Sequence, residues 1–322
     1  MQSRMTSRER VVAAIRREPV DHVPLCGFFN PLSPPQRRGH AWNFPWPEEA
    51  TWEEQTRFQV EQLGLDALVN VSAPVTRQAE GVSAYAYVKG DVLHKVYTTP
   101  AGKLRAAVRY DDRWPHGEEI PFYSDFNIGH FVEPWIKSAA DLECLKQLQV
   151  LRDTDEVVAE CRARFARLRD VADTYGLAVM GHAGTGLTGA QHLFGVRELC
   201  FAVVDHPELV DAYLEHEHRI NLRAIEVLGL LGCDILRRNG FYETADFYGP
   251  AMLERFLGRR LRAEADAARR AGMATAYTVH TGIIPILDYL AGLSFDSLMG
   301  IDIAFPGVEI TRVRDRLAST QA

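Results

Sequence analysis

Residues 5–24 read MTSRERVVAAIRREPVDHVP, and they combine a helix start with the approach to a strand. Thr6 and Glu9 have the spacing of a capping box, in which each side chain accepts a hydrogen bond from the backbone amide of the other residue. An apolar stripe follows at helical spacing, and the proline after it cannot continue a helix. The stretch therefore predicts a helix over residues 6–18 and a first strand that begins near Val23.

The composition indicates a globular chain that builds a large core. Its 322 residues are 47% hydrophobic, which suits one large α/β barrel or two smaller domains. A net charge of -7 argues against nucleic acid or an anionic membrane as the main partner, because a net acidic surface repels both. No apolar run approaches the roughly 20 residues that span a bilayer, and the charged start lacks the apolar core of a signal peptide. We therefore expect a cytoplasmic protein.

The five cysteines are scattered and show no CxxC spacing. This distribution favours reduced, buried thiols over disulfides or a structural zinc site. They are Cys26, Cys144, Cys161, Cys200 and Cys233.

The chain changes character along its length. Residues 28–47 carry five prolines with aromatic residues between them, which predicts a long loop over one end of the fold. Residues 85–110 contain two strand-like runs around Pro100-Ala-Gly102 and predict an inserted β-hairpin. From residue 138 onward helical and strand-like segments alternate, which predicts a parallel sheet with crossover helices.

Six strands and seven helices are expected in this framework, including the helix over residues 6–18. The strands lie near Val23 and over residues 66–71, 177–181, 233–237, 274–279 and 297–301. The further helices lie over residues 52–63, 152–174, 189–229 with a break near Pro207, 250–271, 284–292 and 308–317.

The phrase Glu18-Pro-x-Asp-x-Val-Pro24 after a helix resembles the start of the uroporphyrinogen decarboxylase superfamily. Helix starts such as Asp205-His-Pro-Glu-Leu-Val210 and Tyr248-Gly-Pro-Ala-Met-Leu253 resemble its branch of corrinoid-dependent methyltransferases. The resemblance implies a single domain over residues 1–322 with a (β/α)8 TIM-type barrel fold. Since only six strands are found, we expect the last two to be missing from this chain. The alternative is that two short strands lie between residues 72 and 135.

Functional groups of a barrel lie at the carboxyl ends of its strands, and four such places here carry reactive side chains. His182 lies in the glycine-rich turn Met180-Gly-His-Ala-Gly-Thr-Gly186, which is a weak phosphate motif and equally suits a purely structural turn. Asn239, Tyr242 and Glu243 follow the strand at 233–237, and Asp246 is a weaker candidate acid. Tyr277 and His280 end the strand at 274–279, and Asp302 follows the strand at 297–301. We expect His182, Asn239, Tyr242 and Tyr277 to contact substrate.

The resemblance also implies a metal and a partner protein. The methyltransferase branch carries a His-x-Cys-Gly zinc motif at the strand end where this chain has His280-Thr-Gly282, so only the histidine matches. We expect His280 to bind Zn²⁺, with Glu243 and Asp302 as further ligands or as a general acid/base pair. A corrinoid (cobalamin) on a partner protein would donate or accept the methyl group. Aromatic residues of the 28–47 loop could pack on a substrate ring or on the corrinoid.

The expected function is a methyltransferase that moves a methyl group between a small methylated substrate or thiol and a corrinoid protein. A tetrapyrrole decarboxylase is the second possibility. It ranks below the methyltransferase because the arginine-rich motif of those enzymes is replaced here by Cys26-Gly-Phe-Phe-Asn-Pro31. The aspartate that follows their second strand is replaced by Ala73. A barrel without catalysis that serves as a binding subunit is the third possibility.

Overall fold

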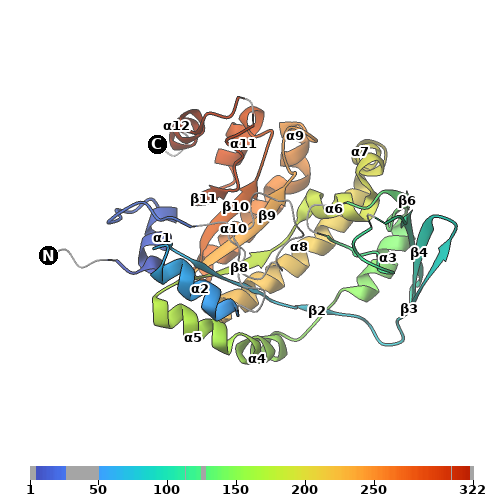
Figure 1. Ribbon diagram of the computed structural model, residues 1–322. Helices are drawn as coiled ribbons and strands as arrows, with labels where there is room; N and C mark the ends of the chain where they lie inside the picture. Colours follow the sequence, from blue (N-terminus) through green and yellow to red (C-terminus); the bar gives the residue numbers. More distant parts are fainter. Residues whose placement is uncertain (1–4, 27–50, 113, 125–127, 306, 320–322) are drawn as a thin grey trace.

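A five-stranded parallel sheet forms the centre of the computed structural model, which describes residues 5–26, 51–112, 114–124, 128–305 and 307–319 (Figure 1). The strand order β1-β8-β9-β10-β11 follows the chain, as it does in the wall of a (β/α) barrel. The strands are Leu68–Ser72, Ala178–Ala183, Ile235–Phe241, Ala274–Val279 and Ser297–Met299. Within the described ranges no sixth strand joins this sheet, so the closed barrel is not confirmed.

Five of the six expected parallel strands are therefore present. The strand expected near Val23 is not formed in residues 23–26, and its continuation lies outside the described residues, as does the loop over 28–47. Leu25 exchanges two hydrogen bonds with Asp66 next to the start of β1. The strands between residues 72 and 135 pair antiparallel in other sheets, so none of them supplies a missing strand of the parallel sheet.

Helix α1, Ser7–Ile15, lies against one face of the parallel sheet. The expected capping box is confirmed, because Thr6 accepts from the Glu9 amide and Glu9 accepts from the Thr6 amide. Val11 of this helix packs in a small apolar cluster with Met180 and Ile235 from β8 and β9. We call this side of the sheet the α1 face.

The other face of the sheet is covered by long crossover helices. Helices α5 and α8 pack on β8, and α10 packs on β10 and on α8. The expected break near Pro207 is confirmed, since α7 ends at Asp205 and α8 begins at Pro207. The helices after α1 are α2 Trp52–Glu61, α3 Ala139–Leu148, α4 Thr154–Arg164, α5 Ala166–Tyr175, α6 Gly186–Phe194, α7 Val196–Asp205, α8 Pro207–Leu230, α9 Pro250–Leu253, η1 Glu254–Gly258, α10 Arg259–Arg270, η2 Ile284–Ile286, α11 Leu287–Ala291 and α12 Ile310–Ser319. No helix in the described ranges has the length and apolar character needed to cross a bilayer.

The inserted hairpin is part of a larger antiparallel sheet. Strands β4 and β5 form the hairpin around Pro100-Ala-Gly102, as expected, and β3 and β6 extend it on either side. This four-stranded sheet packs against α3 and lies apart from the parallel sheet in space (Figure 1). Its strands are β3 Ser83–Lys89, β4 Val92–Thr99, β5 Gly102–Arg109 and β6 Phe131–Glu133, and a separate pair joins β2 Thr76–Arg77 to β7 Val150–Leu151.

Candidate functional site

Polar side chains gather on the α1 face of the sheet, at the carboxyl ends of the strands. Side chains alternate between the two faces along a strand, and residues paired in neighbouring strands point to the same face. The pairs His182 with Arg237 and Asn239 with Thr278 therefore share the face that carries Met180 and Ile235. We call the following set the polar row: Asn70, His182, Arg237, Asn239, Thr278 and His280.

Hydrogen bonds join the polar row in two pairs, one between β1 and β8 and one between β9 and β10, and the register of His182 with Arg237 places the two pairs side by side. The His182 Nε2 atom lies 2.8 Å from Asn70 Oδ1, and Arg237 Nε donates to Thr278 Oγ1 over 2.8 Å. The Arg237 guanidinium also lies over the Phe241 ring, whose centroid is 5.3 Å from that of His280 in a stacked arrangement. Strands that are far apart in the sequence thus place these groups in one continuous patch.

His182 is uncharged at neutral pH. Burial and, to a smaller extent, the neighbouring positive charge of Arg237 together lower the pKa of its imidazole to about 4. A neutral imidazole that donates from Nε2 to the Asn70 oxygen keeps its Nδ1 lone pair. His182 is therefore suited to hydrogen bonding rather than to ion pairing.

His280 has a fixed tautomer. Its Nδ1 atom lies 2.7 Å from the carbonyl oxygen of Gly300, and a carbonyl can only accept, so Nδ1 carries the proton. The opposite nitrogen, Nε2, then presents a lone pair, and this buried atom has no hydrogen-bond partner among the described residues. The side-chain oxygen of Asn239 is buried and unpartnered in the same way. Because buried polar atoms are normally hydrogen-bonded, these two acceptor atoms are available to a hydrogen-bond donor of a bound molecule.

Glu243 lies elsewhere, in a buried charge cluster on the opposite face of the sheet. Arg238 is its centre, because it alternates with Arg237 and Asn239 along β9 and points toward the helices. The Arg238 Nε atom donates to Glu264 over 2.9 Å, and its Nη2 atom lies 3.8 Å from Glu243 and 4.0 Å from Glu217. The Tyr277 hydroxyl donates to the second oxygen of Glu243.

The carboxylates of this cluster differ in their affinity for a proton. Burial raises the pKa of Glu243 to about 7, although Arg238 and the Tyr277 hydroxyl act in the opposite direction. Burial also acts to raise the pKa of Glu264, but Arg238 and hydrogen bonds from His218 and Asn221 bring it below its usual value. Glu264 is therefore the ionised partner of Arg238, and Glu243 binds a proton near neutral pH.

The glycine-rich turn before α6 serves the same cluster. The amides of Thr185 and Gly186 donate to Glu217 over 2.6 and 2.7 Å, and the Leu187 amide donates to Glu243 over 2.7 Å. A Cβ atom at Gly186 would lie 2.0 Å from a Glu243 oxygen, so a larger residue has no room. The amide groups that could have held a phosphate are thus occupied by carboxylates of the protein. The contact with Glu243 therefore explains the glycine at position 186.

The structure brings together only part of the expected site. His182, Asn239 and His280 belong to the polar row, whereas Glu243 and Tyr277 belong to the buried cluster. Within the part of the chain that the structure describes, no three His, Cys, Asp or Glu side chains form a group that could hold a metal ion.

The remaining two candidates lie at loops beside these groups. Asp302 is exposed, accepts from the Ala304 amide, and donates its own amide to the His280 carbonyl. Tyr242 donates its amide to Thr188 and packs its ring edge-on against Phe247.

Arg237, Asn70 and Thr278 were not among the residues expected from the sequence. Two of them could have been found from the alternation of side chains along a strand, because residues two positions apart point to the same face. Arg237 stands two residues before Asn239, and Thr278 stands two residues before His280. Asn70 needed the register of β1 with β8, which no local pattern reveals.

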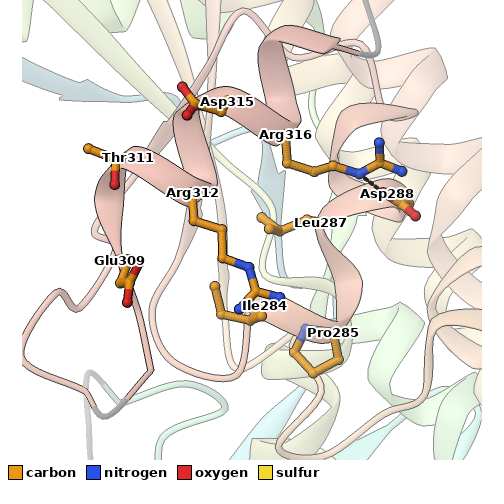
Figure 2. A pocket seen from close by; sticks show the side chains of 9 residues that line it. All are labelled: Ile284, Pro285, Leu287, Asp288, Glu309, Thr311, Arg312, Asp315 and Arg316. Atoms are coloured by element: carbon orange, nitrogen blue, oxygen red, sulfur yellow. Dashed lines mark hydrogen bonds and ion pairs between the residues drawn. The ribbon is translucent and has the colours of Figure 1, made fainter.

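A separate open groove lies between the η2–α11 segment and α12, with a volume of about 720 Å³ (Figure 2). Arg316 closes one side of it through an ion pair of 2.5 Å with Asp288, and Arg312 extends toward Ile284. None of the polar-row residues lines this groove.

Comparison with solved structures shows a similar fold in a methyltransferase from Methanosarcina mazei. The TM-score is 0.54 at 18% sequence identity, and the match covers 98% of this chain and 81% of that one. No family model matches the chain. No curated protein matches it in sequence either. At this identity the likeness establishes the fold and leaves the chemistry to be argued from the side chains.

Proposed function

We propose that this chain is a methyltransferase of the uroporphyrinogen decarboxylase superfamily, which moves a methyl group between a small methylated substrate or thiol and a corrinoid protein. The likeness in fold to a methyltransferase supports it, together with the sequence resemblance described above. The observation that carries the proposal is the unpartnered His280 Nε2 lone pair in a polar row at the carboxyl ends of the strands.

His280 is the base in this proposal. A thiol acceptor loses its proton to Nε2, and the thiolate attacks the methyl carbon while the bond from that carbon to the donor breaks. The Gly300 carbonyl holds the Nδ1 proton and stabilises the imidazolium that forms. Asn239 and His182 orient the substrate through hydrogen bonds.

Zinc remains a prediction to which we assign no step. His280 has the arrangement of a metal ligand, with its second nitrogen donating to a backbone carbonyl. The expected co-ligand Glu243 does not fit, because both of its oxygens already accept hydrogen bonds from Tyr277 and Leu187. Together with the lack of a three-donor group in the described ranges, this means that the described residues alone do not form a zinc site.

The test is methyl exchange between methylcobalamin and a thiol, catalysed by the purified protein. His280→Ala is expected to lower the rate about 10²- to 10⁴-fold, the range that a positioned base contributes. His206→Ala is the matched control, since His206 is an exposed histidine that lies 3.8 Å from Glu208. Metal analysis of both variants determines whether His280 also retains zinc.

Three results would contradict the proposal. Full methyl-exchange activity in His280→Ala would show that His280 is not the base. Carbon dioxide release from a tetrapyrrole tetra-acetate without methyl exchange would favour the decarboxylase. Neither activity, with no bound metal, would favour the binding subunit.

A further inference from the structure

A second cavity lies on the helix-covered side of the parallel sheet. It has a volume of about 300 Å³, is partly open to solvent, and lies between strands β1 and β8, the helices α4 and α5, and the turn that follows α8. Val69 and Val179 form its floor as a register pair of neighbouring strands. All of its lining residues belong to the described part of the chain.

The interior of this cavity is apolar. Val69, Val71 and Val179 are each less than 7% exposed, and Phe165 and Leu168 approach from the break between α4 and α5. Two thiols complete the wall, from Cys161 and Cys233, which are also buried. Burial raises the pKa of Cys233 to about 12 and raises that of Cys161 as well, so both are uncharged at neutral pH.

Three charged residues line the rim of the cavity: Arg162, Arg169 and the exposed Asp170. Arg169 donates from Nη2 to the carbonyls of Leu231 and Gly232, and Arg162 donates to that of Leu230. These bonds fasten both guanidinium groups to the end of α8 and leave their aliphatic stems beside the opening. Water gains little in such a space because it needs two to four polar partners.

We infer that this cavity is a binding site for an uncharged aromatic molecule of one or two rings. Its volume is at the lower end of small-ligand pockets, and its interior is lined mainly by apolar side chains. The Phe165 ring and the two sulfur atoms favour an aromatic occupant over an aliphatic one, because sulfur contacts ring edges favourably. The site is distinct from the polar row, since Val69 and Val179 alternate with Asn70 and Met180 and face the other way.

The test uses naphthalene as the probe and the full chain as the protein. Titration is expected to raise the thermal midpoint saturably and to shift the NMR methyl signals of Val69, Val71 and Val179 through ring currents. Naphthalene-2-sulfonate, which has the same rings with a charge, is expected to give neither effect. Absence of saturable binding would overturn the inference, as would shifts confined to the methyl groups of Met180 and Met299 on the α1 face.

A pair of cysteine variants checks the location independently of function. Cys233→Leu adds carbon atoms inside the cavity and is expected to weaken naphthalene binding at least tenfold. Cys200→Leu makes the same change at an exposed cysteine and is expected to leave binding unchanged. If Cys233→Leu does not fold, the methyl shifts of the unmodified protein still decide the question. Equal affinity in both variants would place the ligand elsewhere.

Discussion

A single backbone carbonyl determines which nitrogen of His280 is available for chemistry. Gly300 supplies this carbonyl and adopts a φ of +73°, a conformation that residues with a side chain rarely take. A Cβ atom there would lie 2.9 Å from His280 Cε1. The glycine is therefore required both by its own backbone and by the ring that it orients.

Gly300→Ala is expected to turn the His280 ring away from its position and to lower methyl exchange at least tenfold. The matched control is Gly272→Ala, which has a φ of +84° and no atom within 4 Å of the added Cβ. Both variants should lose about 1–2 kcal/mol of stability from backbone strain. Nitrogen NMR of the imidazole should show a changed tautomer in Gly300→Ala alone, and an unchanged His280 signal there would contradict the prediction.

Glu243 makes stability depend on pH in a direction opposite to most carboxylates. Its pKa is about 7 in the folded protein against 4.5 for the free side chain, so the folded state binds more protons between these values. Stability from this group is complete below about pH 4.5 and is lost as the pH rises toward 7. The buried His182, His192 and His216 act in the reverse sense, because burial lowers the pKa of each to about 4.

Glu243→Gln isolates this contribution, since the histidines are common to both proteins. The difference in unfolding free energy between the unmodified protein and the variant should change by a few kcal/mol between pH 4.5 and 7. The variant should become more stable relative to the unmodified protein as the pH rises. Urea unfolding at four or five pH values measures it. A constant difference across that range would show that Glu243 has an ordinary pKa.

Helix α6 begins against two carboxylates instead of a side-chain cap of its own. Its first amides donate to Glu217 of α8 and to Glu243 after β9, so the helix start connects three elements. Carboxylates at this position also interact favourably with the positive end of the helix dipole. The turn between β8, which carries His182, and α6 is thereby fixed in place.

Glu217→Ala is expected to cost about 1–3 kcal/mol, because it leaves the Thr185 and Gly186 amides without their acceptor. Hydrogen exchange of these two amides should accelerate. Glu226→Ala on the same helix is the control, since Glu226 is 54% exposed and its ion pair with Arg223 contributes little. Equal effects of the two substitutions would contradict the capping role.

One buried arginine of α1 joins the first helix to the parallel sheet. Arg10 of α1 contacts Asp21 over 2.6 Å and Asp66, next to β1, over 2.5 Å. Asp66 also accepts from the amide of Leu25. The helix, the segment that follows it and the first parallel strand are therefore joined by one network, which gives Asp21 in the opening phrase a structural role.

Arg10→Ala is expected to destabilise the protein by about 3–5 kcal/mol, because the nearly buried Asp66 carboxylate loses its counter-charge. Arg16→Ala is the control at the C-cap of this helix, where an exposed guanidinium donates a hydrogen bond of 3.2 Å to the Gly272 carbonyl. It should cost less than about 0.5 kcal/mol. Denaturant unfolding compares the two, and a small loss in Arg10→Ala would show that the network does not hold the strands together.

Local features were predictable from the sequence because they depend on residues a few positions apart. The capping box of α1, the break at Pro207 and the hairpin around Pro100 all follow from such short-range rules. Five parallel strands were also found by their alternation with helices. The limits of 274–279 were correct, most other limits shifted by one or two residues, and the end of β9 lies four residues later than expected.

Tertiary structure alone decided which side of the sheet each candidate site residue occupies. Glu243 and His280 both follow strand ends in the sequence, yet one joins the Arg238 cluster and the other joins the polar row. The outcome depends on strand register, on the irregularity opposite Thr278 and Val279, and on partners such as Glu217 that lie 26 residues away along the chain. A local pattern cannot contain this information, because a shift of one residue in register moves every side chain to the opposite face.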